Sequence, residues 1–130
     1  MKKVLKLSSI LFVVAFLFTL VSCAPKNAEA ATAKLEKKDY TVMNQALTIQ
    51  ELKEKFGIDG VKNALFCFKK DKDGSMYSLT AVLFEKKSQA KDAASKIKES
   101  NEKANLEINI TIVGKWVIYG SEQAIEDFKN

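Results

Sequence analysis

The chain contains no histidine and no arginine, and it contains only two cysteines, Cys23 and Cys67. Without histidine, the sequence excludes a Ser-His-Asp or Cys-His catalytic arrangement, an imidazole metal ligand and a histidine pH switch. Without arginine, it lacks the planar fork that binds phosphate and carboxylate groups through two parallel hydrogen bonds. Two cysteines are too few for a zinc site built on thiolates. We therefore expect no metal and no cofactor bound by such groups.

All 21 basic residues are lysines, and they stand against 16 acidic residues in a chain of 130 residues. Lys2, Lys3 and Lys6 precede an apolar segment, so that 18 lysines and 16 acids remain from Cys23 onward. This small excess of positive charge gives no reason to expect nucleic-acid binding. The length and the shares of apolar and charged residues are those of one globular domain.

The first 22 residues have the composition of a secretory signal peptide. The three lysines form a positive start, and residues 10–21 then contain Thr19 as their one polar side chain. This apolar core is shorter than the ~20 residues that a helix needs to span a bilayer. A charged start, a short apolar core and small residues before a cleavage site together predict a secreted chain.

The signal segment ends in Leu20, Val21, Ser22 and Cys23. The sequence LVSC resembles the lipobox of bacterial membrane lipoproteins, in which an apolar residue, a tolerant position and a small residue precede a cysteine. In that family a diacylglyceryl group is attached to the thiol, a dedicated peptidase cleaves before the cysteine, and the new amine can be acylated too. An uncleaved anchor helix, or a conventional signal peptide with an unrelated cysteine, is the alternative interpretation.

The resemblance implies that Cys23 is the lipidated first residue of the mature chain. Two or three fatty acyl chains, such as palmitate, anchor a protein firmly, at roughly 0.8 kcal/mol per buried methylene. The expected location is the extracytoplasmic face of a bacterial membrane, with the membrane as a partner through the lipid. We divide the chain into a cleaved signal peptide (1–22), a lipidated tether (23–28) and a single α+β domain (29–130).

Hydrophobic periodicity predicts an alternation of helices and strands along the mature chain. The order is α, β, α, β, β, α, β, β, α. The segments, in this order, are residues 27–40, 40–46, 47–57, 61–70, 75–85, 87–105, 106–113, 116–120 and 122–130, with residue 40 shared by the first two.

Without the first helix, the last helix and the last strand, this order is β-α-β-β-α-β. That is the succession of the ferredoxin-like fold, an α+β fold with an antiparallel sheet of four strands. We therefore predict a ferredoxin-like antiparallel sheet with an added C-terminal hairpin strand and helix, and with an N-terminal helix.

The helix predicted at 47–57 has the most specific local signals. Thr48 and Glu51 have the spacing of a capping box, and Leu47 and Leu52 have that of a hydrophobic staple around it. Gly57 is expected to end this helix, because glycine adopts the left-handed conformation without strain.

Other local signals define the later elements. Ser88 and Ser121 are placed to cap the last two helices. The alternating Ile108, Ile110 and Ile112 are expected to share one face of a strand. A further small-residue face is predicted for the long helix, formed by Ala90, Ala93, Ala94, Ile97 and Ala104.

The segment DKDG predicts a hairpin turn at Asp73 and Gly74. It also has a superficial likeness to a calcium-binding loop. Aligned on Gly74, such a loop would need carboxylates where the chain has Lys69 and Thr80, so a calcium site is excluded.

Cys67 is the one thiol that remains after Cys23 is lipidated. It lies between Phe66 and Phe68 in a predicted strand, where a thiol without a general base behaves as a small apolar side chain. A structural role is the favoured interpretation, and an intermolecular disulfide outside the cytoplasm is the alternative.

Three aromatic residues are the candidate binding surface. Tyr77, Trp116 and Tyr119 lie in predicted strands and could form a stacking platform for a sugar or a peptide. The alternative is that they belong to the core, as strand aromatics often do. The carboxylate pairs Asp71/Asp73 and Glu126/Asp127 fall in a turn and on a helix face, without the signs of a catalytic cleft.

The sequence therefore predicts a small lipid-anchored lipoprotein that is not an enzyme. Its expected role is that of an interaction or binding module with a protein partner in the cell envelope. The alternatives are a small-ligand receptor component of a transporter, a regulator or inhibitor of an envelope enzyme, and an enzyme that uses Ser, Lys or carboxylates.

Overall fold

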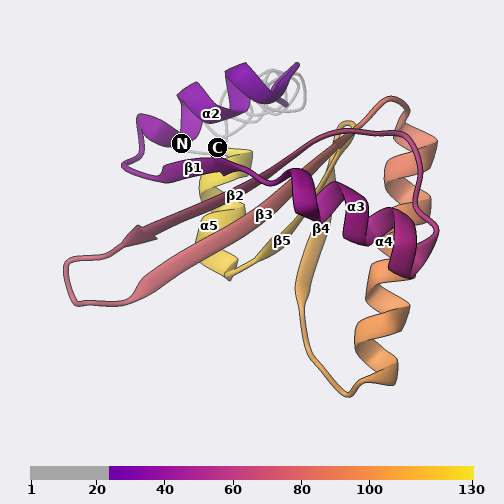
Figure 1. The fold of residues 1–130 in the computed structure, drawn as a ribbon. Helices are drawn as coiled ribbons and strands as arrows, with labels where there is room; N and C mark the ends of the chain where they lie inside the picture. Colours follow the sequence, from indigo (N-terminus) through magenta and orange to yellow (C-terminus); the bar gives the residue numbers. More distant parts are fainter. Residues whose placement is uncertain (1–23) are drawn as a thin grey trace, which may run out of the picture.

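The structure is a computed structural model that describes residues 24–130, so that Leu20, Val21, Ser22 and Cys23 lie outside the described residues. The described chain folds into helices packed on both sides of one sheet (Figure 1). Its elements are α2 (Ala28–Glu36), β1 (Thr41–Asn44), α3 (Ala46–Phe56), β2 (Val61–Lys70), β3 (Met76–Phe84), α4 (Lys87–Lys103), β4 (Asn109–Val113), β5 (Trp116–Gly120) and α5 (Glu122–Lys129).

The five strands form one antiparallel sheet in the order β1-β2-β3-β5-β4. The predicted α+β class and the predicted order of elements are confirmed. The succession β1-α3-β2-β3-α4-β4 is β-α-β-β-α-β, and α2, β5 and α5 are added to it. The strand order, which the sequence left open, places β5 between β3 and β4, so that β4 lies at one edge and β1 at the other.

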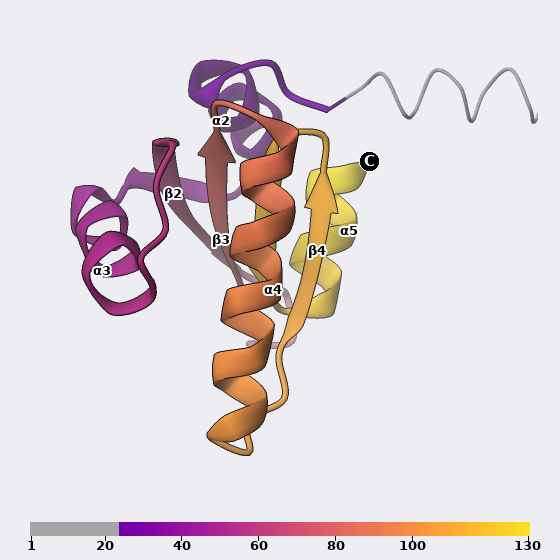
Figure 2. The ribbon, with the colours of Figure 1, turned by 90° about the vertical axis from the view of Figure 1, so that its right-hand side faces the viewer.

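The helices divide between the two faces of the sheet. Helices α2 and α5 pack on what we call the first face, and α3 and α4 pack on the second face (Figure 2). The first core contains buried residues of α2, α5 and the inward positions of β2, β3 and β5. Its largest fully buried side chains are Trp116, Phe128, Leu35, Leu65, Leu79 and Ile118.

The second core lies beneath α3 and α4. Its buried residues are Leu52, Ile58, Ala64, Val82, Phe84, Ala90, Ala93, Ile97 and Val117. The small side chains predicted for the long helix do allow a close approach, although Ala104 is exposed beyond the end of α4. The inward residues of α5, Ala124, Ile125 and Phe128, are confirmed.

The predicted capping box and staple of the second helix are wrong. Helix α3 begins at Ala46, because the N–H of Gln45 still donates to the carbonyl oxygen of Ala64 (2.9 Å) as the chain leaves β1. Thr48 is therefore inside the first turn, and Leu47 is 70% exposed. The end at Gly57 is confirmed, with φ of +65°.

Two other predicted caps also differ. Helix α4 begins at Lys87, and the side chain of Gln89, rather than that of Ser88, accepts the N–H of Lys86 (3.0 Å). Ser121 does precede α5, but its hydroxyl bonds to the backbone of Ser78 instead of the helix. At α4 the competing side chain belongs to the helix's own first turn, whereas at α5 the backbone of β3 takes the hydroxyl that could have capped the helix.

The turn between β2 and β3 is the predicted hairpin. Asp71 N–H donates to the carbonyl oxygen of Ser75 (2.7 Å), and Gly74 adopts φ of +92°. Strand β4 is shorter than predicted, since it begins at Asn109 and leaves Ile108 before it.

Candidate functional site

The start of the described chain is fixed to the folded domain. The indole N–H of Trp116 donates to the carbonyl oxygen of Pro25 (2.8 Å). A Cβ added at Gly114 would lie 3.2 Å from the Cβ of Ala24, so glycine allows the two segments to approach. The residue that follows Cys23 therefore lies at the turn between β4 and β5.

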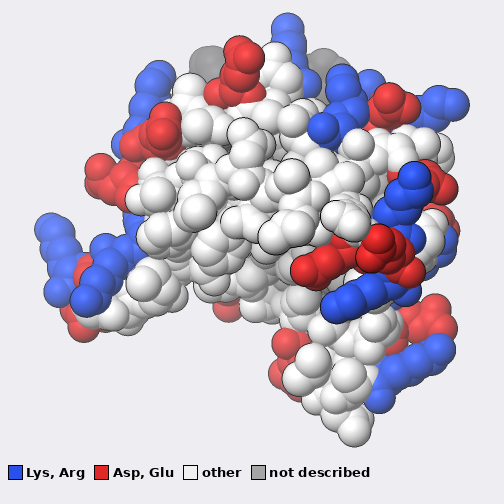
Figure 3. Space-filling model, in the orientation of Figure 1, with Lys and Arg blue, Asp and Glu red and all other residues white. Residues whose placement is uncertain are grey.

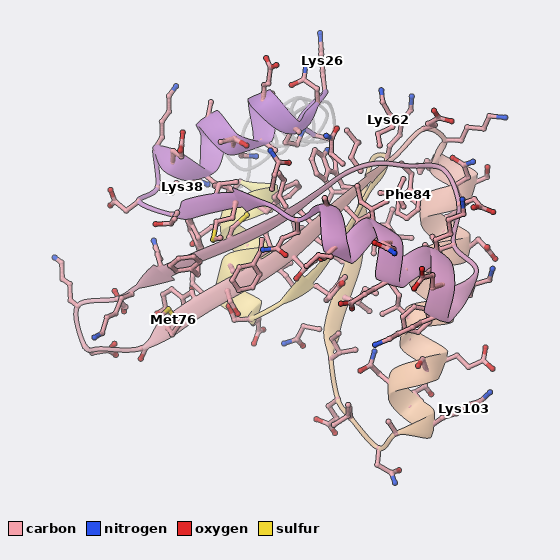
Figure 4. The ribbon with its side chains drawn as sticks, in the orientation of Figure 1. Lys26, Lys38, Lys62, Met76, Phe84 and Lys103 are labelled. Carbon is pink, nitrogen blue, oxygen red and sulfur yellow. The ribbon has the colours of Figure 1, made fainter. Side chains whose placement is uncertain are left out.

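Several loops meet at this same end, which we call the N-terminal end of the domain. Phe84 N–H donates to Lys115 O (2.9 Å), and Glu85 N–H donates to Gly60 O (2.9 Å). In Figure 4, Lys26 and Lys62 both project from this end. The exposed lysines here are Lys26, Lys62, Lys86, Lys87 and Lys115, and the acids are Glu29, Asp59 and Glu85. Positive charge is therefore in excess at the end of the domain where the described chain begins.

The three predicted platform aromatics do not form one surface. Trp116 is fully buried in the first core, where its ring packs edge-on against Phe128 at 5.4 Å between centroids. Tyr119 is half-buried on the second face, and burial raises the pKa of its phenol. Alternation along β5 separates the two rings, so the platform prediction is wrong for Trp116.

Tyr77 lies on the first face, away from Tyr119. Its O–H donates to Asp71 (3.1 Å), and this hydrogen bond raises the pKa of the phenol. With Met76 and the first turn of α5, Tyr77 lines a shallow hollow of about 480 Å³. Tyr77 is thus a predicted platform aromatic that borders a hollow.

A different aromatic surface lies on the second face, and the sequence reasoning missed it. Helices α3 and α4 leave the part of the sheet near the hairpin uncovered, and we call this part the open sheet face (Figure 3). Phe66 and Phe68 lie on it with centroids 5.7 Å apart, each only half-buried, and Met43 is 46% exposed. The pairing register adds polar neighbours to this face, namely Thr41, Ser78 and Thr80.

The alternation of side chains along β2 could have indicated this surface from the sequence. Leu65 and Cys67 point into the first core, so Phe66 and Phe68 must point to the opposite face. Whether a helix covers that face cannot be read from β2 alone, because it depends on where α3 and α4 pack.

Cys67 is fully buried and reduced, as the structural interpretation expects. Burial raises the pKa of its thiol to about 12. The thiolate, which is the reactive form, is therefore scarce at neutral pH.

A group of charged and phenolic side chains joins α5 to β2 and to the segment between α2 and β1. Tyr40 O–H donates to Asp127 Oδ2 (2.6 Å), and Lys69 Nζ lies 3.8 Å from the same oxygen and 4.8 Å from the Tyr40 ring centre. Burial, aided by Asp127, raises the pKa of Tyr40. Lys38 Nζ donates to the backbone oxygen of Asp127 (2.6 Å) near the C-terminus of α5. The polar groups in these contacts are thus partners of one another, and the contacts fasten α5 to the first face of the sheet.

No family model matches the chain, and no curated protein or solved structure matches it. Within residues 24–130, histidine, cysteine and acidic side chains form no group of three or more that could hold a metal ion. In that same part of the chain, no helix is both long and apolar enough to cross a membrane.

Proposed function

We propose that this protein is a bacterial lipoprotein, anchored through acyl chains on Cys23 to the extracytoplasmic face of a membrane. The LVSC sequence at the end of a signal-like segment carries the proposal. The hydrogen bond between Trp116 and Pro25 supports it, since it gives the domain a fixed attachment two residues after the cysteine. The lysines at the N-terminal end would face anionic headgroups and add to the attraction.

We further propose that the domain is a non-catalytic module that binds a protein of the cell envelope. The open sheet face supports this role, because Phe66, Phe68 and Met43 leave apolar surface in water that a partner could bury. Aromatic residues and methionine are also enriched in protein interfaces.

Replacement of the two cysteines tests the anchor. Cys23→Ser removes the thiol that would receive the lipid, so the chain should accumulate as an uncleaved precursor. Cys67→Ala is the matched control, and it should be processed and fractionate with membranes like the wild type. Normal processing and membrane anchoring of Cys23→Ser would overturn the lipoprotein proposal.

Site-specific crosslinking tests the interaction role. A photoreactive residue at Thr41, on the open sheet face, should crosslink one envelope protein in intact cells. The same group at Lys55, on the exposed side of α3, should not. Phe68→Lys in the Thr41 variant should remove the crosslink, and a crosslink that survives Phe68→Lys would contradict binding through this face.

A further inference from the structure

Strand β4 is an open edge of the sheet, because it pairs with β5 and with no other described strand. Its outward backbone groups are therefore available to an added strand. Helix α4 runs beside this edge on the second face (Figure 2). A groove of about 590 Å³ lies between them, lined by Lys91, Ala94, Ser95 and Lys98 of α4 and by Ile110, Thr111 and Ile112 of β4.

The groove continues past the start of β4. Lys98 also lines a second hollow of about 460 Å³, which reaches Leu106 and Ile108. Leu106 is 60% exposed there, and Glu102 and Glu107 are its charged neighbours. The two hollows share Lys98 and follow the chain from Ile112 back to Leu106, so together they are long enough for an extended segment.

The chemistry of the groove fits strand addition. An added strand would bond to the backbone of β4, and every second side chain would point toward α4. Ile110 and Ile112 offer apolar floor, and the small Ala94 and Ser95 leave room on the helix wall. Main-chain bonds would thus supply affinity, and the alternate side chains would supply specificity.

The charge on the α4 side of the groove indicates which kind of segment would bind there. Lys91 and Lys98 both line the β4 part of the groove, which contains no acidic residue. Two acids beside them on α4 pair with other lysines, Asp92 with Lys96 (3.2 Å) and Glu99 with Lys103 (3.1 Å), whereas Glu102 and Glu107 line the second hollow and not the β4 part. An acidic side chain on an added strand would therefore meet two lysines.

We propose that β4 and α4 bind an extended segment of a partner protein as a sixth strand, with its acidic side chains against Lys91 and Lys98. A second copy of this chain is disfavoured, because antiparallel pairing of two β4 strands would bring two lysine walls together. The inference deepens the proposed binding function and rests on it, but it uses a surface separate from the open sheet face.

A synthetic strand tests the inference on the full lipidated protein in phosphatidylcholine vesicles. The probe is a labelled nine-residue peptide with threonine at alternate positions and with valine and glutamate alternating between them. It should bind, with affinity falling as salt rises. The same peptide with lysine for glutamate, and one N-methylated at every internal residue, should each bind at least tenfold more weakly.

Charge reversal locates the binding. Lys91→Glu with Lys98→Glu should weaken the glutamate peptide at least tenfold and improve binding of the lysine peptide. Lys55→Glu with Lys72→Glu makes the same change of net charge on exposed residues outside the groove, and should alter the dissociation constant less than twofold. Thermal unfolding of each variant checks that it is folded. The comparison of the three peptides on the wild-type protein tests the inference even if a variant fails to fold.

Equal binding of the glutamate, lysine and N-methylated peptides, or no binding of the first, would overturn the inference. Concentration-dependent dimers that Lys91→Glu with Lys98→Glu strengthens would also overturn it, in favour of a second copy. Crosslinking from Thr41 reports separately on the open sheet face, so failure of the groove and failure of the general binding role remain distinguishable.

Discussion

At the scale of single residues, Trp116 joins the N-terminal segment to the core. Its ring is fully buried and its indole N–H bonds to Pro25 O. Trp116→Phe leaves that carbonyl without its donor and creates a small cavity, so we expect the free energy of unfolding to fall by about 2 kcal/mol. Urea denaturation measures this, and proteolysis near Pro25 should become faster.

Phe66→Leu is the control for this loss. Phe66 is half-buried on the open sheet face, so its truncation should cost less than about 1 kcal/mol. Equal losses in the two variants would contradict the different positions that the structure gives these rings.

Ionisation of Cys67 should make the free energy of unfolding depend on pH in the alkaline range. Because burial raises its pKa to about 12, the folded state holds the thiol proton more tightly than the unfolded state, whose thiol has a pKa of about 8.5. The contribution is complete below about pH 8.5 and is lost as the pH rises toward 12. Tyr40, whose pKa is also raised, adds to the loss at the upper end of this range.

Urea midpoints measured between pH 7 and pH 11 test this linkage. We expect the wild type to lose more of its stability across the range than Cys67→Ala, which has no thiol to ionise. Parallel curves for the two proteins would show that Cys67 does not titrate on unfolding.

At the scale of elements, the two ends of α3 should respond differently to substitution. Thr48 forms no cap, so Thr48→Ala should change the free energy of unfolding by less than about 0.5 kcal/mol. Gly57 has φ of +65°, and a Cβ there would meet nothing within 4 Å, so Gly57→Ala should cost about 1 kcal/mol through backbone strain alone. Thermal or urea unfolding measures both changes. A loss of unfolding free energy above this limit in Thr48→Ala would indicate that Thr48 does cap the helix.

Local chemistry made some elements predictable. Gly57 and Gly74 adopt conformations that other residues avoid, and the inward face of α5 follows from its period. The start of α3 was not predictable in this way, because the hydrogen bond from Gln45 to Ala64 joins the residue after β1 to β2, which lies beyond the helix in the sequence. The open sheet face was missed for a similar reason, since exposure of Phe66 and Phe68 depends on the placement of α3 and α4.

At the scale of the whole molecule, three surfaces have different positions. The N-terminal end collects lysines beside the start of the described chain (Figure 4), the open sheet face lies near the hairpin (Figure 3), and the groove follows the β4 edge. In the proposed arrangement the first surface lies against the lipid headgroups. The other two then remain accessible to proteins of the envelope.

The central claim is that acyl chains on Cys23 replace the signal segment as the anchor. The intact mass of the protein extracted from bacterial membranes tests it most directly. We predict the mass of residues 23–130 plus a diacylglyceryl group, with or without a further amide-linked acyl chain. A mass equal to the full chain of 130 residues, or to a chain that retains an unmodified Cys23, would contradict the account.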